Sequence, residues 1–228
     1  MRMENKFVLT EPSNGDIYAR IMTCKYLFRE IFYERRVNNI YLDTITLDNF
    51  KENMDGVQNR EKHRIRWYGN HLGVDTPILE YKIKHGELGY KQYYPMPSFQ
   101  RHRCFDYGTY MERIGDNIQS QPVRTHIMFQ EISLELPTLY NSYLRRYFLS
   151  EDSRFRITID KDITYKSPDN MFENGFSLQE DRLIVELKYE KDCIDGARRI
   201  IQYLGLRLAK NSKYVRGVLG LYFNTFYD

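Results

Sequence analysis

The sequence predicts an α+β fold in which an antiparallel sheet closes into a barrel, with helices that flank and plug it. The first observation is that many segments alternate apolar and polar side chains with a period of two, whereas few show helical spacing. The second is that several strands carry charges on one face and apolar side chains on the other. If the apolar faces pack outward against helices, the charged faces converge inside the barrel.

The first half of the chain supplies most of the expected sheet. Residues 15–34 place Ile17, Ile21 and Ile31 at roughly helical spacing, with Asp16 as an N-cap. A short helix is expected to end at Gly56, because glycine readily adopts the conformation that closes a helix. The expected strands are 5–10, 38–44, 62–69, 76–86 and 87–96, with 62–69 and 76–86 paired as a hairpin, and the short helix covers 46–56.

The second half mixes both element types. Residues 98–121 are expected to form helix and loop, and a helix is expected to begin after Pro122 within 122–136. The remaining expected elements are strands at 136–150, 155–167 and 182–191, a helix at 195–209, and a basic segment at 210–217.

The length fits one large domain or two small ones, and one domain over residues 1–228 is the expectation. Composition indicates a globular protein, with a net charge of only +3. That excess does not favour nucleic acid as a partner. The three cysteines form no CxxC pair, which is typical of a reducing cytoplasm. No signal pattern opens the chain, and no apolar run approaches the ~18 residues that span a bilayer.

The stretch "KHRIRWYG" at 62–69 shows the recurring charge pattern, with Arg64 and Arg66 on one face and Ile65 and Trp67 on the other. For one such pair, a solvated face is the ordinary interpretation. The pattern recurs, however, at Glu4 and Lys6; Glu80, Lys82 and Lys84; Tyr143, Arg145 and Tyr147; Arg154, Arg156 and Asp160; and Glu186 and Lys188.

Taken together, these faces predict a wide, wet interior that binds a polyanion, because unpaired buried charge costs several kcal/mol per ion. Arginine suits this purpose because its planar fork binds phosphate at two points. The few acids could pair with the bases or hold a divalent cation, and both alternatives stay open.

Other candidate residues carry weaker signals. The five histidines lack ligand spacing and are expected to be surface or structural residues. Residues 85–89, "HGELG", fit a hairpin turn better than a phosphate loop. Trp67 is expected in the core, and Tyr143 or Tyr68 could contact the nucleobase of a bound nucleotide. No motif for a nucleophilic hydrolase is present.

Several segments in order resemble the vacuolar transporter chaperone (VTC) domain, the polyphosphate polymerase branch of the triphosphate tunnel metalloenzymes, a CYTH-like superfamily. They are "RMENKF" at 2–7, "NNIYLDTITLDNFKENMDG" at 38–56, "RIRWYG" at 64–69, "LEYKIK" at 79–84, "LRRYFLS" at 144–150, "FRITID" at 155–160, "VELKY" at 185–189 and "KNSKYVRG" at 210–217. The wider superfamily opens with ExExK, whereas this chain has Arg2 at the first acidic position, which favours the polymerase branch over a two-metal triphosphatase.

The resemblance implies an antiparallel eight-stranded tunnel, the triphosphate tunnel fold, that binds ATP and a growing polyphosphate. The implied catalytic residues are Arg64, Arg66, Lys82, Arg145 and Arg156. The implied phosphate- and nucleotide-binding residues are Lys6, Lys84, Arg154, Lys188, Lys210, Ser212 and Lys213. Glu186 and Glu4 are the implied ligands of Mn²⁺ or Mg²⁺.

The function expected from this resemblance is metal-dependent transfer of the γ-phosphoryl group of ATP to polyphosphate. The alternatives are a triphosphatase or nucleotide hydrolase of the same fold, and a non-catalytic polyphosphate-binding module that regulates a partner. The expected ligands are ATP and polyphosphate or pyrophosphate. The expected location is the cytoplasm, with recruitment to the inner face of a membrane by a membrane-protein partner left open, because this chain has no spanning segment of its own to export polymer.

Overall fold

The computed structural model describes residues 2–10, 14–69, 73–74, 76–86, 88–100, 106–118, 132, 134–173 and 175–225. The chain divides into two compact units, each made of three separate segments. Unit 1 consists of Met1–Arg36, Tyr143–Thr164 and Gln179–Ser212, and unit 2 consists of Val37–Ser142, Tyr165–Leu178 and Lys213–Asp228. The prediction of one domain over 1–228 stays a prediction.

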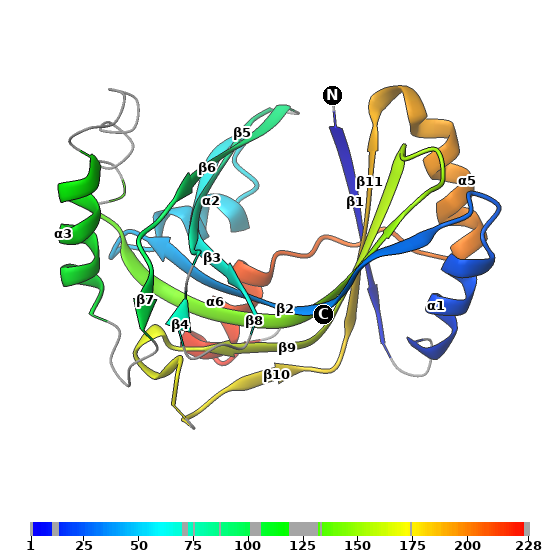
Figure 1. Cartoon of the computed structure of the whole chain (residues 1–228). Helices are drawn as coiled ribbons and strands as arrows, with labels where there is room; N and C mark the ends of the chain where they lie inside the picture. The colour runs from blue at the N-terminus through cyan, green and yellow to red at the C-terminus, as the bar shows by residue number, and fades with distance from the viewer. Residues whose placement is uncertain are drawn as a thin grey trace. The chain divides into compact units, whose positions relative to one another are not determined.

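A single antiparallel sheet supplies most of the strands, as predicted (Figure 1). Its pairing order is β1-β11-β9-β8-β2-β3-β5-β6, with β10 paired to β9. The order is a linear path with β1 and β6 at its ends, so hydrogen bonding among the described residues does not close the predicted barrel. The strands are β1 (Arg2–Leu9), β2 (Arg29–Asp43), β3 (Asn59–Tyr68), β5 (Ile78–His85), β6 (Leu88–Pro95), β8 (Leu136–Leu149), β9 (Phe155–Lys166), β10 (Leu178–Glu180) and β11 (Leu183–Glu190). A separate pair joins β4 (Gly73–Val74) to β7 (Phe99–Gln100).

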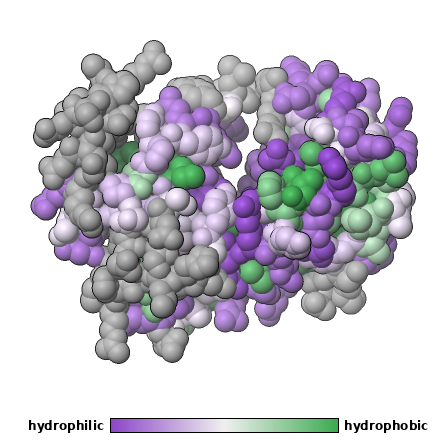
Figure 2. Space-filling view, in the orientation of Figure 1, coloured by the Kyte–Doolittle hydropathy of each residue, from purple (hydrophilic) through white to green (hydrophobic). Residues whose placement is uncertain are grey.

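In unit 1, two helices cover the apolar face of the strands. They are α1 (Asn14–Thr23) and α5 (Ile194–Leu204), which follows the 3₁₀ turn η2 (Lys191–Cys193). Ile21 of α1 and Ile200 of α5 are buried with Phe7, Ile157 and Leu187 from the strands in one hydrophobic cluster. The predicted cover of the apolar faces by helices is therefore confirmed in this unit. Figure 2 shows a hydrophobic surface patch where α1 and α5 lie in Figure 1, within a mostly hydrophilic face.

In unit 2, the apolar face of the β3–β5 pair is buried in a hydrophobic cluster. Ile65, Trp67 and Leu79 share a hydrophobic cluster with Tyr110, a residue of α3. The placement of Trp67 in the core is confirmed, since only 5% of it is exposed. The helices of this unit are α2 (Asp48–Met54), α3 (Tyr107–Ile118) and α6 (Lys213–Tyr222), with the 3₁₀ turn η1 (Pro168–Asn170).

Most strand predictions are confirmed, including the antiparallel 62–69 and 76–86 pair. The helix predicted over 15–34 is wrong in its second half, because α1 ends at Thr23 and β2 begins at Arg29. Leu27 turns the chain between them with φ 50°. Asp16 is not the cap but lies in the first turn, where it accepts from Arg20 Nε at 2.5 Å.

Two predictions at the C-terminal end change as well. Helix α5 ends at Leu204 rather than reaching residue 209, and Gly205 follows it with φ 65°. The segment expected only to be basic, 210–217, contains the start of α6. The helix predicted within 122–136 falls almost wholly outside the described residues. No helix in the described part of the chain is long and apolar enough to cross a membrane.

Candidate functional site

Unit 2 carries a strongly basic sheet face on β3, β5 and β6. Residues opposite each other in antiparallel strands share a face, so the register sorts the side chains without ambiguity. Seven bases and one acid lie on this face, which we call the basic face: Arg60, Lys62, Arg64, Arg66, Lys82, Lys84 and Lys91, with Glu80. The structure thus brings together four residues that the sequence indicated: Arg64, Arg66, Lys82 and Lys84.

Glu80 holds the two arginines of the basic face in place. Its Oε2 accepts from Arg64 Nε at 2.8 Å and also from Arg64 Nη2, while its Oε1 lies 3.1 Å from Arg66 Nη1. Burial alone would raise the pKa of Glu80, but Arg64 and Arg66 reverse that effect and lower it to about 2. Arg66 Nε also donates to Asn39 Oδ1 at 2.8 Å, and Arg64 Nη1 donates to Tyr41 at 3.2 Å. The guanidinium groups are therefore oriented before any ligand arrives.

Three lysines cross the basic face in a row. Lys62 of β3 is opposite Lys82 of β5, which is opposite Lys91 of β6. Like charges in directly opposed positions destabilise a sheet. A bound polyanion would relieve this repulsion.

Helix α6 is anchored beside the basic face through Tyr41. The Tyr214 ring stacks on the Tyr41 ring with centroids 5.1 Å apart, and the Tyr214 hydroxyl donates to Asp43. Burial, followed by the charge of Asp43, raises the pKa of Tyr214. Lys213 immediately precedes Tyr214 and is only 9% exposed. Lys213, a predicted phosphate-binding residue, is therefore the first residue of α6, and α6 packs against Tyr41, which accepts a hydrogen bond from Arg64.

The opposite face of β3 contains a buried histidine. His63 Nδ1 lies 2.8 Å from both carboxylate oxygens of Glu135, and its Nε2 lies 3.5 Å from Glu61. Burial lowers the pKa of His63, but its contacts with these two acids outweigh that effect and raise the pKa to about 9. The structural role expected for His63 is consistent with this position away from Arg64.

Unit 1 carries a second charged face, in which acids and bases alternate. Glu4 is opposite Lys188 across β1 and β11, Lys6 is opposite Glu186, and Lys188 is opposite Arg156 across β11 and β9. Lys6 Nζ lies 3.4 Å from Glu4 and 3.5 Å from Glu186. Lys188 Nζ lies 3.6 Å from Glu4 and 3.0 Å from Glu186. The paired face, as we call it, comprises Glu4, Lys6, Arg145, Arg156, Asp160, Glu186 and Lys188.

Arg145 fixes the centre of the paired face from β8. Its Nε and Nη2 donate to the two oxygens of buried Asp160, the latter at 2.6 Å, and its Nη2 lies 3.7 Å from Glu186. Although burial lowers the pKa of Arg145, Asp160 and Glu186 help raise it, so Arg145 stays charged. The placement of Asp160 on the arginine face is confirmed, and the acids do pair with the bases.

The segment before α6 lies against β1. Lys6 Nζ donates to the carbonyl oxygen of Asn211 at 3.2 Å, and the Ala209 amide donates to the Lys6 carbonyl at 2.9 Å. Lys210 and Ser212 are the sequence neighbours of Asn211, so each lies one residue away from a direct contact of Lys6.

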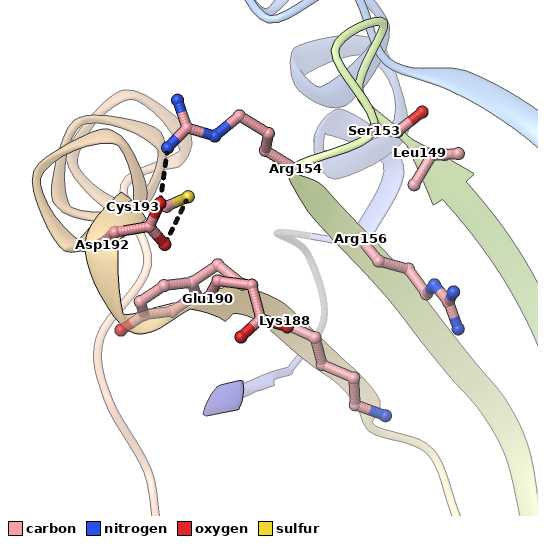
Figure 3. A pocket seen from close by; sticks show the side chains of 9 residues that line it. Leu149, Ser153, Arg154, Arg156, Lys188, Glu190, Asp192 and Cys193 are labelled. Carbon is pink, nitrogen blue, oxygen red and sulfur yellow. Dashed lines mark hydrogen bonds and ion pairs between the residues drawn. The ribbon is translucent and has the colours of Figure 1, made fainter. Parts of the chain in front are cut away.

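Arg154, in contrast, turns away from the paired face. Figure 3 shows Arg156 and Lys188 extending the same way from β9 and β11, whereas Arg154 extends toward Asp192. Arg154 Nη2 donates to Asp192 Oδ2 at 3.1 Å, and both side chains are more than half exposed. Of these two predicted phosphate-contacting arginines, Arg156 lies on the paired face and Arg154 does not.

The predicted metal ligands are compatible with one divalent cation. Glu4 and Glu186 contact the same two lysine ammonium groups. Thr158 is opposite Glu186, and its buried Oγ1 has no hydrogen-bond partner among the described residues. These oxygens suit a hard cation that keeps phosphate or water ligands. No cluster of three or more His, Cys, Asp or Glu suited to a metal occurs in the part of the chain that the structure describes.

Sequence reasoning missed three bases of the basic face: Arg60, Lys62 and Lys91. Arg60 and Lys62 have the same parity as Arg64 and Arg66, so extending the alternation backward would have found them. Lys91 joins the face through the register of β5 with β6, which a single sequence does not reveal.

Comparison with known structures gives weak likenesses. A candidate adenylate cyclase from Vibrio parahaemolyticus has 11% identity and a TM-score of 0.49, over 92% of this chain and 94% of that one. A protein from Pyrococcus horikoshii has 15% identity and a TM-score of 0.49, over 94% and 96%. The mimivirus capping enzyme triphosphatase has 11% identity and a TM-score of 0.36, over 88% and 90%.

The comparison with curated sequences and the comparison with family models give different results. No curated protein matches this chain. The family model described as the VTC domain, however, matches residues 1–222, nearly the full length, and confirms the resemblance seen in the strand motifs. This chain belongs to the VTC domain family.

Proposed function

We propose that this chain is a polyphosphate polymerase domain that transfers the γ-phosphoryl group of a nucleoside triphosphate to a polyphosphate chain. The observation that carries the proposal is the basic face, with seven bases and one acid on three adjacent strands. Such a surface suits a ligand with many negative charges in a row. Membership of the VTC domain family supports the same substrate class.

The proposed reaction asks the protein for positioning and charge stabilisation. A terminal oxygen of the acceptor polyphosphate attacks the γ-phosphorus. A new P–O bond forms while the bond from the γ-phosphorus to the β,γ-bridging oxygen breaks, and ADP leaves. The acceptor oxygen is already anionic, so no general base is needed. The roles proposed for Arg64, Arg66, Lys82, Arg145 and Arg156 are to hold the phosphate oxygens and stabilise their charge.

The proposed metal is Mn²⁺ or Mg²⁺, held by Glu186 and Glu4. When bound, such an ion neutralises phosphate charge and orients the triphosphate. The proposed role of Lys6 and Lys188 is to hold both carboxylates within reach of one cation. The proposed ligands of the protein are ATP and polyphosphate or pyrophosphate, and the proposed location is the cytoplasm.

One observation favours a second candidate, a polyphosphate-binding module without catalysis. Glu186 already has three cationic neighbours, at 3.5 Å, 3.0 Å and 3.7 Å. A metal ion must compete with these charges. If it fails to do so, the basic face still binds polyphosphate, but transfer does not occur.

The deciding experiment incubates the purified chain with ATP and Mn²⁺, then measures polyphosphate on a gel beside released phosphate. Long polymer is expected, and chelation of the metal should stop its formation. Free phosphate without polymer would instead identify a triphosphatase. Neither product, together with retained binding of polyphosphate, would identify the binding module. Loss of polymer in Arg66→Ala, with unchanged secondary structure by circular dichroism, would connect the activity to the basic face.

A further inference from the structure

A pocket lies in unit 1 beside the outermost residues of the paired face (Figure 3). Its volume is about 220 Å³. It is formed by the end of β8, the start of β9 with the turn before it, the end of β11 and the turn η2. Its lining includes Leu149, Arg154, Arg156, Lys188, Glu190, Asp192 and Cys193.

The charges of this pocket change sign along β11. Lys188 and Arg156, opposite each other in the sheet, provide positive charge at the end nearer the paired face. Glu190 and Asp192 follow Lys188 along the chain and place two carboxylates at the other end, where Arg154 pairs with Asp192. A phosphate group would be attracted to the first end and repelled from the second. The pocket is therefore poorly suited to a ligand that is anionic throughout.

Local contacts keep the acidic end ionised and in position. Asp192 accepts from Cys193 Sγ at 3.5 Å and from Arg154 Nη2 at 3.1 Å. The bond from Cys193 is the main cause that lowers the pKa of Asp192, and Arg154 adds to it. Carboxylates so placed accept hydrogen bonds, and neutral hydroxyl groups donate them without charge repulsion.

A nucleoside triphosphate has the matching order of groups, because its phosphates are anionic and its ribose is neutral and rich in hydroxyls. Carboxylates are the side chains that bind ribose hydroxyls in other nucleotide sites. The pocket is smaller than the roughly 300–1,000 Å³ typical of sites for drug-sized ligands. Its volume thus suits one sugar with part of a base, and Leu149 offers an apolar wall.

We propose that this pocket binds the ribose of the substrate nucleotide, with Glu190 and Asp192 as acceptors for its hydroxyls and with Arg156 and Lys188 directed to its phosphates. The inference rests on the proposed function, since it assumes that a nucleotide is the phosphoryl donor. It adds substrate specificity to that function. The basic side chains bind the phosphates of both a nucleoside triphosphate and inorganic polyphosphate, whereas these two acids bind only the ribose, which inorganic polyphosphate lacks.

The test compares dissociation constants by calorimetry for ATP, 2′-deoxy-ATP, 3′-deoxy-ATP and inorganic tripolyphosphate. The variants are Glu190→Gln and Asp192→Asn, which keep side-chain size and remove only the charge. The matched control is Asp195→Asn, because Asp195 is an exposed acid on α5 paired with Arg198, outside the pocket lining. Thermal melting without ligand verifies that each variant is folded.

We expect at least one deoxy analogue to bind wild type about tenfold more weakly than ATP. At least one acid variant should lose about tenfold in affinity for ATP and bind tripolyphosphate as tightly as wild type or more tightly. Asp195→Asn should leave all four constants unchanged. Equal binding of ATP and both deoxy analogues, or parallel changes for ATP and tripolyphosphate in both variants, would overturn the ribose site. Failure of wild type to bind tripolyphosphate at all would instead overturn the proposed function.

Discussion

The basic face of unit 2 and the paired face of unit 1 are built on similar antiparallel strands but differ in charge balance. The basic face has seven bases for one acid on β3, β5 and β6. The paired face has four bases for three acids; Glu4 and Glu186 contact several bases each, and Asp160 pairs with Arg145. A sheet face can therefore use charge for two purposes: to hold itself together, or to hold a ligand. Substitutions that remove charge should have opposite effects on the two faces.

The largest expected effect is a loss of unfolding free energy when a charge is removed from the paired face. Asp160→Asn removes the buried partner of Arg145, and leaving one member of a buried ion pair costs about 3–5 kcal/mol of unfolding free energy. Urea denaturation measures the loss. Asp162→Asn is the matched control, because Asp162 is exposed on the same strand. Equal stability of the two variants would show that the Arg145–Asp160 pair does not hold this face together.

The next effect concerns the buried histidine behind the basic face. The pKa of His63 is about 9 in the folded protein against 6.5 for the ordinary value, so protonated His63 stabilises the fold. This contribution, about 3 kcal/mol, is complete below pH 6.5 and disappears as pH rises through 9. The expected result is a falling urea midpoint between pH 6 and pH 9.5, which is much flatter in His63→Gln. The same slope in both proteins would contradict the assignment.

A smaller effect is expected on the basic face, where one substitution should stabilise the free protein but weaken its binding of tripolyphosphate. Lys82→Glu breaks the Lys62–Lys82–Lys91 row and should raise the melting temperature of the free protein slightly. Its affinity for tripolyphosphate should fall about a hundredfold, or about 2.7 kcal/mol, because one attraction becomes a repulsion. Calorimetry and thermal melting test the two parts. Lys51→Glu, on the exposed side of α2, controls for net charge.

The smallest effect should come from the rim of the same face. Lys84 is opposite Gly89, next to the turn at Gly86, and lies beyond the row formed by Lys62, Lys82 and Lys91. Lys84→Ala is expected to weaken tripolyphosphate binding by only about twofold, in line with exposed ion pairs. A loss as large as that of Lys82→Glu would mean that the ligand extends along the whole strand.

Sequence alternation predicted the faces of β3, β5, β9 and β11 correctly, because each has one buried and one charged side. Residues 29–34 were misassigned to a helix, since this half of β2 is mostly exposed on both sides and shows no period of two. Helix α6 was missed because "KNSKYVRG" is dominated by charge, although Tyr214 and Val218 are buried in the structure.

The charged faces were predictable as separate strands, but their pairing was not. The alternation indicates that Arg64 and Glu80 each lie on a polar face, and only the register places them opposite each other. The Cys193–Asp192–Arg154 cluster at the pocket depends on where η2 meets β9, which is a tertiary contact. For these reasons residue types were predictable and their partners were not.

The clamp that Glu80 places on Arg64 and Arg66 has a consequence for ligand choice. Any anion that reaches these arginines must compete with a carboxylate that is already there, as anions compete for the sites of an exchange resin. A lone phosphate offers one group against a tethered competitor. A linked series of phosphates brings neighbouring charges to the lysine row at the same moment, so the exchange favours chains over single ions.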